Sequence, residues 1–126
     1  PRAEVQRLQA RAMSEEQLQR NVMHAAKTLR LKVAHFGRAL TPRGKWLTPT
    51  RGDAKGFPDL LIVGPSGVLF RELKDQTGRL SPDQKLWIAA LQQAGEDVAV
   101  WRPADWINGT VQTELDALRT ARKQPA

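Results

Sequence analysis

The chain of 126 residues is long enough for one domain with a modest hydrophobic core. Its 20 lysines and arginines outnumber its 13 aspartates and glutamates, and the formal net charge of +7 favours a polyanionic partner such as nucleic acid. The chain has no cysteine, which excludes disulfides and thiolate metal sites, and no apolar run is long enough to span a membrane. We therefore expect a cytoplasmic protein without a membrane partner.

The first strong structural signal in chain order is a helix. Residues 1–13 precede it and are charged throughout, so we predict that they form an N-terminal extension. Ser14 and Gln17 form a capping-box signature, and apolar residues then recur at helical spacing, which predicts a helix from about 14 to 30. The stretch LKVAHF at 31–36 predicts the first strand.

The middle of the chain predicts a long loop and then a β-hairpin. Residues 37–57 are polar and rich in glycine, which indicates a loop. Two apolar, β-prone stretches at 59–63 and 68–74 follow the loop as strands. The sequence GPSG between them indicates a tight turn, which makes the two strands antiparallel neighbours.

The last part of the chain predicts a second helix, a fourth strand and a terminal helix. Ser81 caps the second helix, which ends at Gly95, and the fourth strand covers 97–101. The stretch RPADWINGT is expected to be irregular, and a C-terminal helix and tail follow at 108–126. The order of helix, three strands, helix and strand predicts an α/β domain at 14–107, with a small mixed β-sheet flanked by helices.

The predicted hairpin brings two carboxylates together. A two-residue turn places Asp59 directly opposite Glu72, with their Cβ atoms roughly 4.5–5.5 Å apart, and it places Lys74 on the same face. Opposed carboxylates repel each other, and a hard divalent cation such as Mg²⁺ or Mn²⁺ removes that conflict. The backbone carbonyl of Leu73 offers a further oxygen ligand, and Lys74 is placed to orient a metal-bound water. The alternative is an acid at a strand entry beside an ordinary surface Glu–Lys pair.

Two more polar side chains fall near the buried faces of the predicted helices. Glu15 lies near the apolar stripe of the first helix and is placed to act as a third carboxylate. The alternative is a first-turn acid stabilised by the helix dipole. Gln84 lies on the inner face of the second helix, where it can hydrogen-bond a metal-bound water or a phosphate, or simply complete a capping box.

A basic loop leads directly into this hairpin and indicates a phosphate-binding arm for DNA, with an ordinary solvated loop as the alternative. Its candidate phosphate ligands are Arg38, Arg43, Lys45, Arg51 and Lys55. Trp46 in the same loop either stacks on a base or packs against the core. Arg71 and Arg79 are expected to flank the site, where Arg79 either contacts a phosphate or remains an ordinary surface charge.

The residues of the hairpin and second helix resemble the PD-(D/E)xK nuclease superfamily. Within it they are similar to the VRR-NUC group, the virus-type replication-repair nucleases. The motifs that carry the resemblance are GFPDLLIV, RELK, GRLSPDQKLWIAALQQAG and VAVWRPADW. The resemblance implies a restriction-endonuclease-like fold with the element order predicted above. It also implies that Asp59, Glu72, Lys74, Gln84 and Glu15 form the catalytic set, and that Asp59, Glu72, Glu15 and the Leu73 carbonyl bind metal.

The resemblance also implies a reaction and a substrate. The expected reaction is hydrolysis of DNA phosphodiesters with Mg²⁺ or Mn²⁺ as the cofactor. The chain has little beyond the minimal domain, so it is similar to stand-alone, phage-like members that resolve Holliday junctions as homodimers in a bacterial or phage-infected cell. The alternatives are a nuclease of the same fold that acts on flaps, nicks or duplex DNA, and a non-catalytic DNA-binding module.

Overall fold

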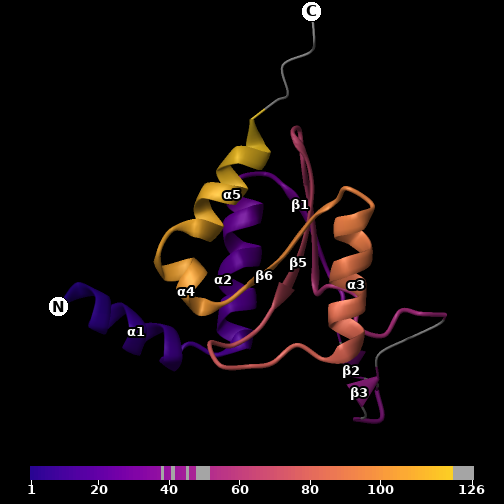
Figure 1. Ribbon diagram of the computed structural model, residues 1–126, viewed down its shortest axis with the longest axis horizontal. Helices are drawn as coiled ribbons and strands as arrows, with labels where there is room; N and C mark the ends of the chain where they lie inside the picture. The colour runs from indigo at the N-terminus through magenta and orange to yellow at the C-terminus, as the bar shows by residue number, and fades with distance from the viewer. Residues whose placement is uncertain (38, 41, 45, 48–51, 121–126) are drawn as a thin grey trace, which may run out of the picture.

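The computed structural model describes residues 1–37, 39–40, 42–44, 46–47 and 52–120 (Figure 1). The helices are α1 (Arg2–Ala12), α2 (Glu15–Thr28), α3 (Pro82–Gln93), α4 (Pro103–Ile107) and α5 (Thr110–Arg119). The strands are β1 (Lys32–His35), β2 (Ala39–Leu40), β3 (Trp46–Leu47), β4 (Leu60–Gly64), β5 (Gly67–Leu73) and β6 (Asp97–Trp101). Among the described helices, none is long and apolar enough to cross a membrane.

The centre of the fold is a mixed sheet of four strands in the order β1-β4-β5-β6. Strands β1, β4 and β5 are antiparallel to their neighbours, whereas β5 and β6 run parallel. Helices α2 and α5 lie on one face of the sheet and α3 lies on the other (Figure 1). This arrangement confirms the predicted α/β fold class with a small mixed sheet flanked by helices.

The hydrophobic core lies between the sheet and helices α2 and α5. Alternate residues of β4 point into it, so Leu60 and Ile62 are fully buried. Helix α2 contributes Leu18, Val22 and Ala26, which recur at helical spacing on one face. Burial of each large aliphatic side chain contributes roughly 1.5–3 kcal/mol to stability. The core therefore fixes the orientation of α2 and β4, and with it the positions of the residues at their ends.

The register of the predicted hairpin is confirmed. Gly64 pairs with Gly67, Val63 pairs with Val68, and a two-residue turn joins the strands. The ladder ends at the pair Leu60–Arg71, so Asp59 and Glu72 lie one step beyond its last pair. The two acids are therefore neighbours at the same end of the sheet.

Four described elements lie where the sequence pattern predicts none. Helix α1 forms within the predicted extension and packs on α4, where it buries Ala10. The predicted loop contains the short antiparallel pair β2–β3. The stretch expected to be irregular forms α4, because Pro103 occupies its first turn and the Asp105 carboxylate accepts the backbone N–H of Arg102 at 2.8 Å.

Candidate active site

Five sequence-predicted residues come from four elements whose ends meet at one edge of the sheet. Asp59 precedes β4, Glu72 lies near the end of β5, and Lys74 follows β5. Glu15 begins α2 and Gln84 lies in the first turn of α3. Figure 1 shows the N-terminal ends of α2 and α3 beside the C-terminal end of β5, at the lower edge of the molecule.

The two central carboxylates are held at different depths. Glu72 is 1% exposed, and the nearby Asp59 carboxylate accepts the backbone N–H of Leu73 at 2.8 Å. Burial, the charge of Asp59 and a hydrogen bond with its carboxyl together raise the pKa of Glu72 to about 9, against the opposing effect of Lys74. Without a cation, the Asp59–Glu72 pair therefore holds a proton at neutral pH.

One oxygen of Glu72 is left without an N–H donor among the described residues. Oε1 accepts a hydrogen bond of 2.9 Å from Nε2 of Gln84, whereas Oε2 is buried and receives no N–H of the described residues, so that only a proton shared with Asp59 or a cation can satisfy it. An unsatisfied buried oxygen is costly unless a cation or a donor reaches it. The acidic pair fits a hard divalent cation, because carboxylate oxygens are the ligands that Mg²⁺ and Mn²⁺ prefer.

The carboxylates alone do not enclose a cation. In the part of the chain that the structure describes, no group of three or more acidic or histidine side chains is placed to hold a metal ion. A cation held by Asp59 and Glu72 needs further oxygens from backbone or water, which Mg²⁺ usually retains. The Leu73 carbonyl stays a prediction for one of them.

Glu15 lies at the rim of the site. Its side chain is exposed at the first residue of α2, yet its charge interacts with those of Asp59 and Lys74. Partial burial raises its pKa, the charge of Asp59 raises it further, and Lys74 lowers it. Glu15 is thus both a first-turn acid and an outer member of the charged cluster.

Gln84 completes the predicted capping box and also contacts Glu72, which the sequence did not predict. Its Oε1 accepts the backbone N–H of Ser81 at 2.8 Å, and its own N–H donates to the Ser81 hydroxyl at 3.2 Å, which completes the capping box. Its Nε2 still donates to Glu72. The residue therefore ties the N-terminus of α3 to the buried carboxylate.

An aromatic cluster, unforeseen from the sequence, fixes the chain that enters the site. The Phe57 ring makes edge-to-face contacts with Phe36, Phe70 and Trp87, at centroid separations of 5.4, 6.2 and 5.0 Å. The Trp87 indole N–H donates to the Asp53 carbonyl at 2.8 Å. The segment before Asp59 is therefore anchored to α3 and to the sheet.

Gly56 brings the same segment against the backbone of α3. Its φ is +86°, and a Cβ at this position would lie 2.5 Å from the carbonyl carbon of Asp83. Only glycine fits this approach without displacing one of the two backbones. Nearby, Nζ of Lys55 lies 3.6 Å from Oδ2 of Asp83, although the Lys55 side chain is largely exposed.

Arg71 does not flank the site, contrary to the prediction from the sequence. Successive strand residues point to opposite faces, so Arg71 points away from Glu72. It is 2% exposed and pairs with Asp97 at 2.8 Å and Glu114 at 2.7 Å, with its guanidinium 5.0 Å from the Trp101 ring centroid. Arg71 therefore has a structural role between β5, β6 and α5.

The predicted DNA-binding residues are only partly within the described structure. Arg38, Lys45 and Arg51 lie outside the described residues, and the backbone of Trp46 lies in β3. Arg43 and Lys55 are exposed. Arg79 is exposed in the turn after Lys74, and Arg102 holds this turn by donating to the Asp75 and Gly78 carbonyls. Their contacts with DNA stay predictions.

Comparisons with known proteins agree with this fold. The family model for the VRR-NUC domain matches residues 3–105, which is most of the chain. A solved structure described as "VRR_NUC domain protein" has 22% sequence identity and a TM-score of 0.52, over 88% of this chain and 94% of that one, which shows a common fold. A search of the curated proteins finds no match. This chain therefore belongs to the VRR-NUC family and is a nuclease of the PD-(D/E)xK type.

Proposed function

We propose that this nuclease is a metal-dependent, structure-selective DNA endonuclease that hydrolyses phosphodiester bonds. The observation that carries the proposal is the buried Glu72 carboxylate, which lies beside Asp59 with one oxygen lacking an N–H donor among the described residues. A DNA-binding module has no need of paired acids, since their charge repels phosphates. A cation at the pair turns that repulsion into attraction.

Each residue of the site has a distinct role in this proposal. Asp59 and Glu72, with the Leu73 carbonyl, would hold Mg²⁺ or Mn²⁺, and Glu15 would contribute from the rim. When bound, a divalent cation would lower the pKa of the attacking water and stabilise the charge that develops on the phosphate. The Lys74 ammonium would orient that water and neutralise negative charge that develops in the transition state.

Gln84 positions the buried acid for this chemistry. Its Nε2 donates to Oε1 of Glu72, so the carboxylate presents Oε2 to the site. Because the capping box also fixes the Gln84 side chain, the orientation of Glu72 depends on where α3 begins. Gln84 therefore links the position of a helix to the geometry of the acidic pair.

The proposed substrate is branched DNA, above all a four-way junction cut by a homodimer. The net charge of +7 supports a DNA partner. Symmetric resolution of a junction needs two active sites, which a C₂ dimer supplies. The alternative substrates in this proposal are flaps, nicks and plain duplexes, and the basic residues before β4, with Arg79, are the proposed phosphate ligands.

The deciding experiment compares labelled four-way junction, flap and linear duplex with Mg²⁺ or with EDTA. The variants are Glu72→Gln and a matched control, Glu96→Gln, which alters an exposed carboxylate just before β6, at the opposite end of the sheet. We expect paired cuts in the junction by the wild type and the control, and no cuts with EDTA or by Glu72→Gln. Cutting by Glu72→Gln, or tight binding without cutting under any metal, would contradict the proposal.

A further inference from the structure

Helix α1 carries basic side chains for which the active site gives no role. Arg7 and Arg11 are four residues apart, so they lie on the same side of the helix, about 6 Å apart along its axis. Both are exposed, and neither forms an ion pair with a carboxylate of the described residues. Glu4, one turn earlier, is the acidic residue of this helix.

The two arginines line a groove that leads to the active site. Arg7 and Arg11 border a groove of about 550 Å³ between α1 and α4, which Gln76 and Asn108 also line. Arg11 borders a second hollow as well, together with Ser14 and with Asp75 and Thr77 of the turn that follows Lys74. Ser14 caps the helix that begins with Glu15, so the path ends at the rim of the site.

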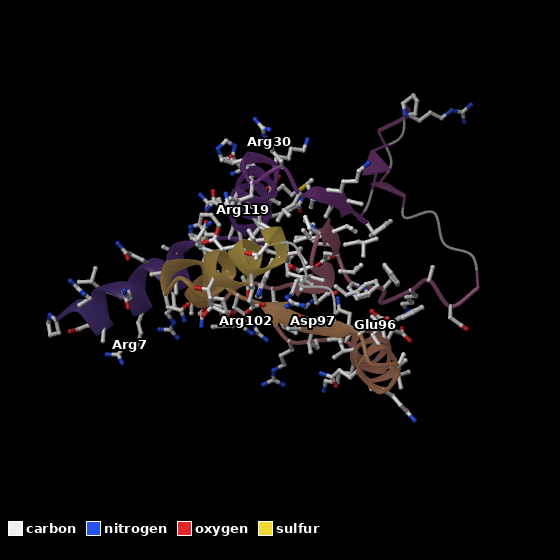
Figure 2. The ribbon with its side chains drawn as sticks, turned by 90° about the horizontal axis from the view of Figure 1, so that it is seen from above. Arg7, Arg30, Glu96, Asp97, Arg102 and Arg119 are labelled. Atoms are coloured by element: carbon white, nitrogen blue, oxygen red, sulfur yellow. The ribbon has the colours of Figure 1, made fainter. Side chains whose placement is uncertain are left out.

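Helix α1 lies on the opposite side of the molecule from the β2–β3 pair (Figure 1). Figure 1 shows α1 extending from the lower edge of the molecule on one side, and the β2–β3 pair extending on the other, with the active-site ends of α2, α3 and β5 between them. Figure 2 shows the same separation from above, with Arg7 pointing outward from its helix. A long substrate that crosses the site passes both projections.

We propose that α1 is a second DNA-binding arm, in which Arg7 and Arg11 bind phosphates of the duplex that extends from the cleaved bond. This proposal rests on the proposed nuclease function. The 11 residues of α1 cover about 16 Å, which corresponds to about five base pairs of duplex. Polar Gln76 and Asn108 in the groove offer hydrogen bonds to phosphate or sugar oxygens.

A dimer contact through this helix face fits the observations less well. The exposed apolar side chains of α1 are Val5 and Leu8, which are too few for the roughly 800 Å² per partner of a stable interface. Arg7 and Arg11 in such a contact would lose hydration without a paired carboxylate on their own chain. Phosphates supply the missing negative charge.

The test measures DNA affinity by fluorescence anisotropy in EDTA, where binding is read without cleavage. The variant is Arg7→Gln/Arg11→Gln. Its control, Lys27→Gln/Arg119→Gln, removes the same charge from the last turns of α2 and α5, away from the site. We expect the Arg7/Arg11 variant to bind a junction with long arms about tenfold more weakly. The plot of log affinity against log salt concentration should also become shallower by about 1.8, which corresponds to two lost phosphate contacts. Arg7→Lys/Arg11→Lys, which keeps both charges, should keep most of that slope.

Arm length separates a local contact from a general loss of charge. We expect the affinity difference between wild type and the Arg7/Arg11 variant to vanish when each arm is shortened to about four base pairs and closed by a hairpin loop, which keeps the junction assembled. An equal loss in the control pair, an equal loss on all arm lengths, or a change of molecular mass in light scattering without a change in affinity would each overturn the proposal. A wild type that binds DNA and does not cut it would overturn the proposed function instead. The affinity comparison would still show whether α1 binds DNA.

Discussion

Glu72 is the residue on which chemistry and stability conflict. Its folded-state pKa of about 9 lies above its ordinary value of 4.5, mainly because of burial and then because of Asp59. The folded protein therefore binds the Glu72 proton more tightly than the unfolded chain does. Stability from this group is fully present below about pH 4.5 and is lost as pH rises towards 9. A bound cation offsets this loss, so the acid destabilises the protein mainly when no metal is present.

Glu72→Gln should therefore stabilise the metal-free protein at alkaline pH. The amide removes the ionisation and keeps an oxygen to accept the hydrogen bond from Gln84. We expect the melting temperature in EDTA at pH 8 to rise by about 5 °C, and the gain to shrink towards pH 4.5. Added Mg²⁺ should raise the melting temperature of the wild type and leave that of the variant unchanged. A variant less stable than the wild type at pH 8 would contradict the assignment of a destabilising buried acid.

Lys74 tests the chemistry at a position that is not a metal ligand. Its ammonium interacts with Glu72 and Glu15 from the end of β5, and its backbone N–H donates to the Trp101 carbonyl at 3.2 Å. Lys74→Ala keeps that backbone bond, so we expect the variant to fold and to bind DNA with near wild-type affinity. Cleavage should fall by at least about 100-fold. An active Lys74→Ala enzyme would remove the residue from the mechanism.

At the scale of elements, the segment before β4 is positioned by contacts that are distant in sequence. Gly56 lies against Asp83 of α3, and Phe57 lies between Phe36 and Trp87. Asp59, the proposed metal ligand, follows two residues after Phe57. Because α3 also supplies Gln84, one helix positions both neighbours of Glu72 in the site.

Gly56→Ala tests this coupling between α3 and the acidic pair. The new Cβ would meet the Asp83 backbone, so the loop or the helix must move. We expect cleavage to fall more than about tenfold, with a loss of about 1–3 kcal/mol in stability. Gly52→Ala is the matched control, because Gly52 also has a positive φ, of +61°, but no atom of the described residues lies within 4 Å of its added Cβ. Equal effects of both substitutions would show that backbone strain alone is responsible.

The sequence predicts local pairings well and distant contacts poorly. The β4–β5 register follows from the two-residue turn and the alternation of apolar residues, and the structure confirms it. The capping box of Gln84 follows from its place in the first turn of α3, whereas its contact with Glu72, 12 positions away, does not. The aromatic cluster around Phe57 joins residues that are up to 51 positions apart in the chain, between Phe36 and Trp87, so no local pattern reveals it. The helix α4 does have a local signal, in Pro103 and Asp105, and the segment was nevertheless predicted to be irregular.

At the scale of the whole molecule, the arrangement suggests a DNA path along one edge. The acidic pair lies at the C-terminal end of β5, with α1 on one side and the β2–β3 pair on the other (Figure 1). A single chain presents one acidic pair of this kind in its described part, which is enough to cut one strand. Two symmetric cuts in a junction therefore need a second copy of the chain.

Mixed dimers test whether two sites act together on one junction. Wild-type subunits are mixed with an excess of Glu72→Gln subunits that carry a distinct tag, and the mixed species is purified through both tags. If the protein resolves junctions as a homodimer, the mixed species should cut one strand and release a nicked junction, whereas the wild-type dimer releases two linear duplexes. The Glu96→Gln subunit serves as the control partner and should leave both cuts intact, because its altered side chain lies at the far end of the sheet. Full resolution by the mixed species would mean that one site cuts both strands in turn, and the absence of any mixed species would mean that the active enzyme is a monomer.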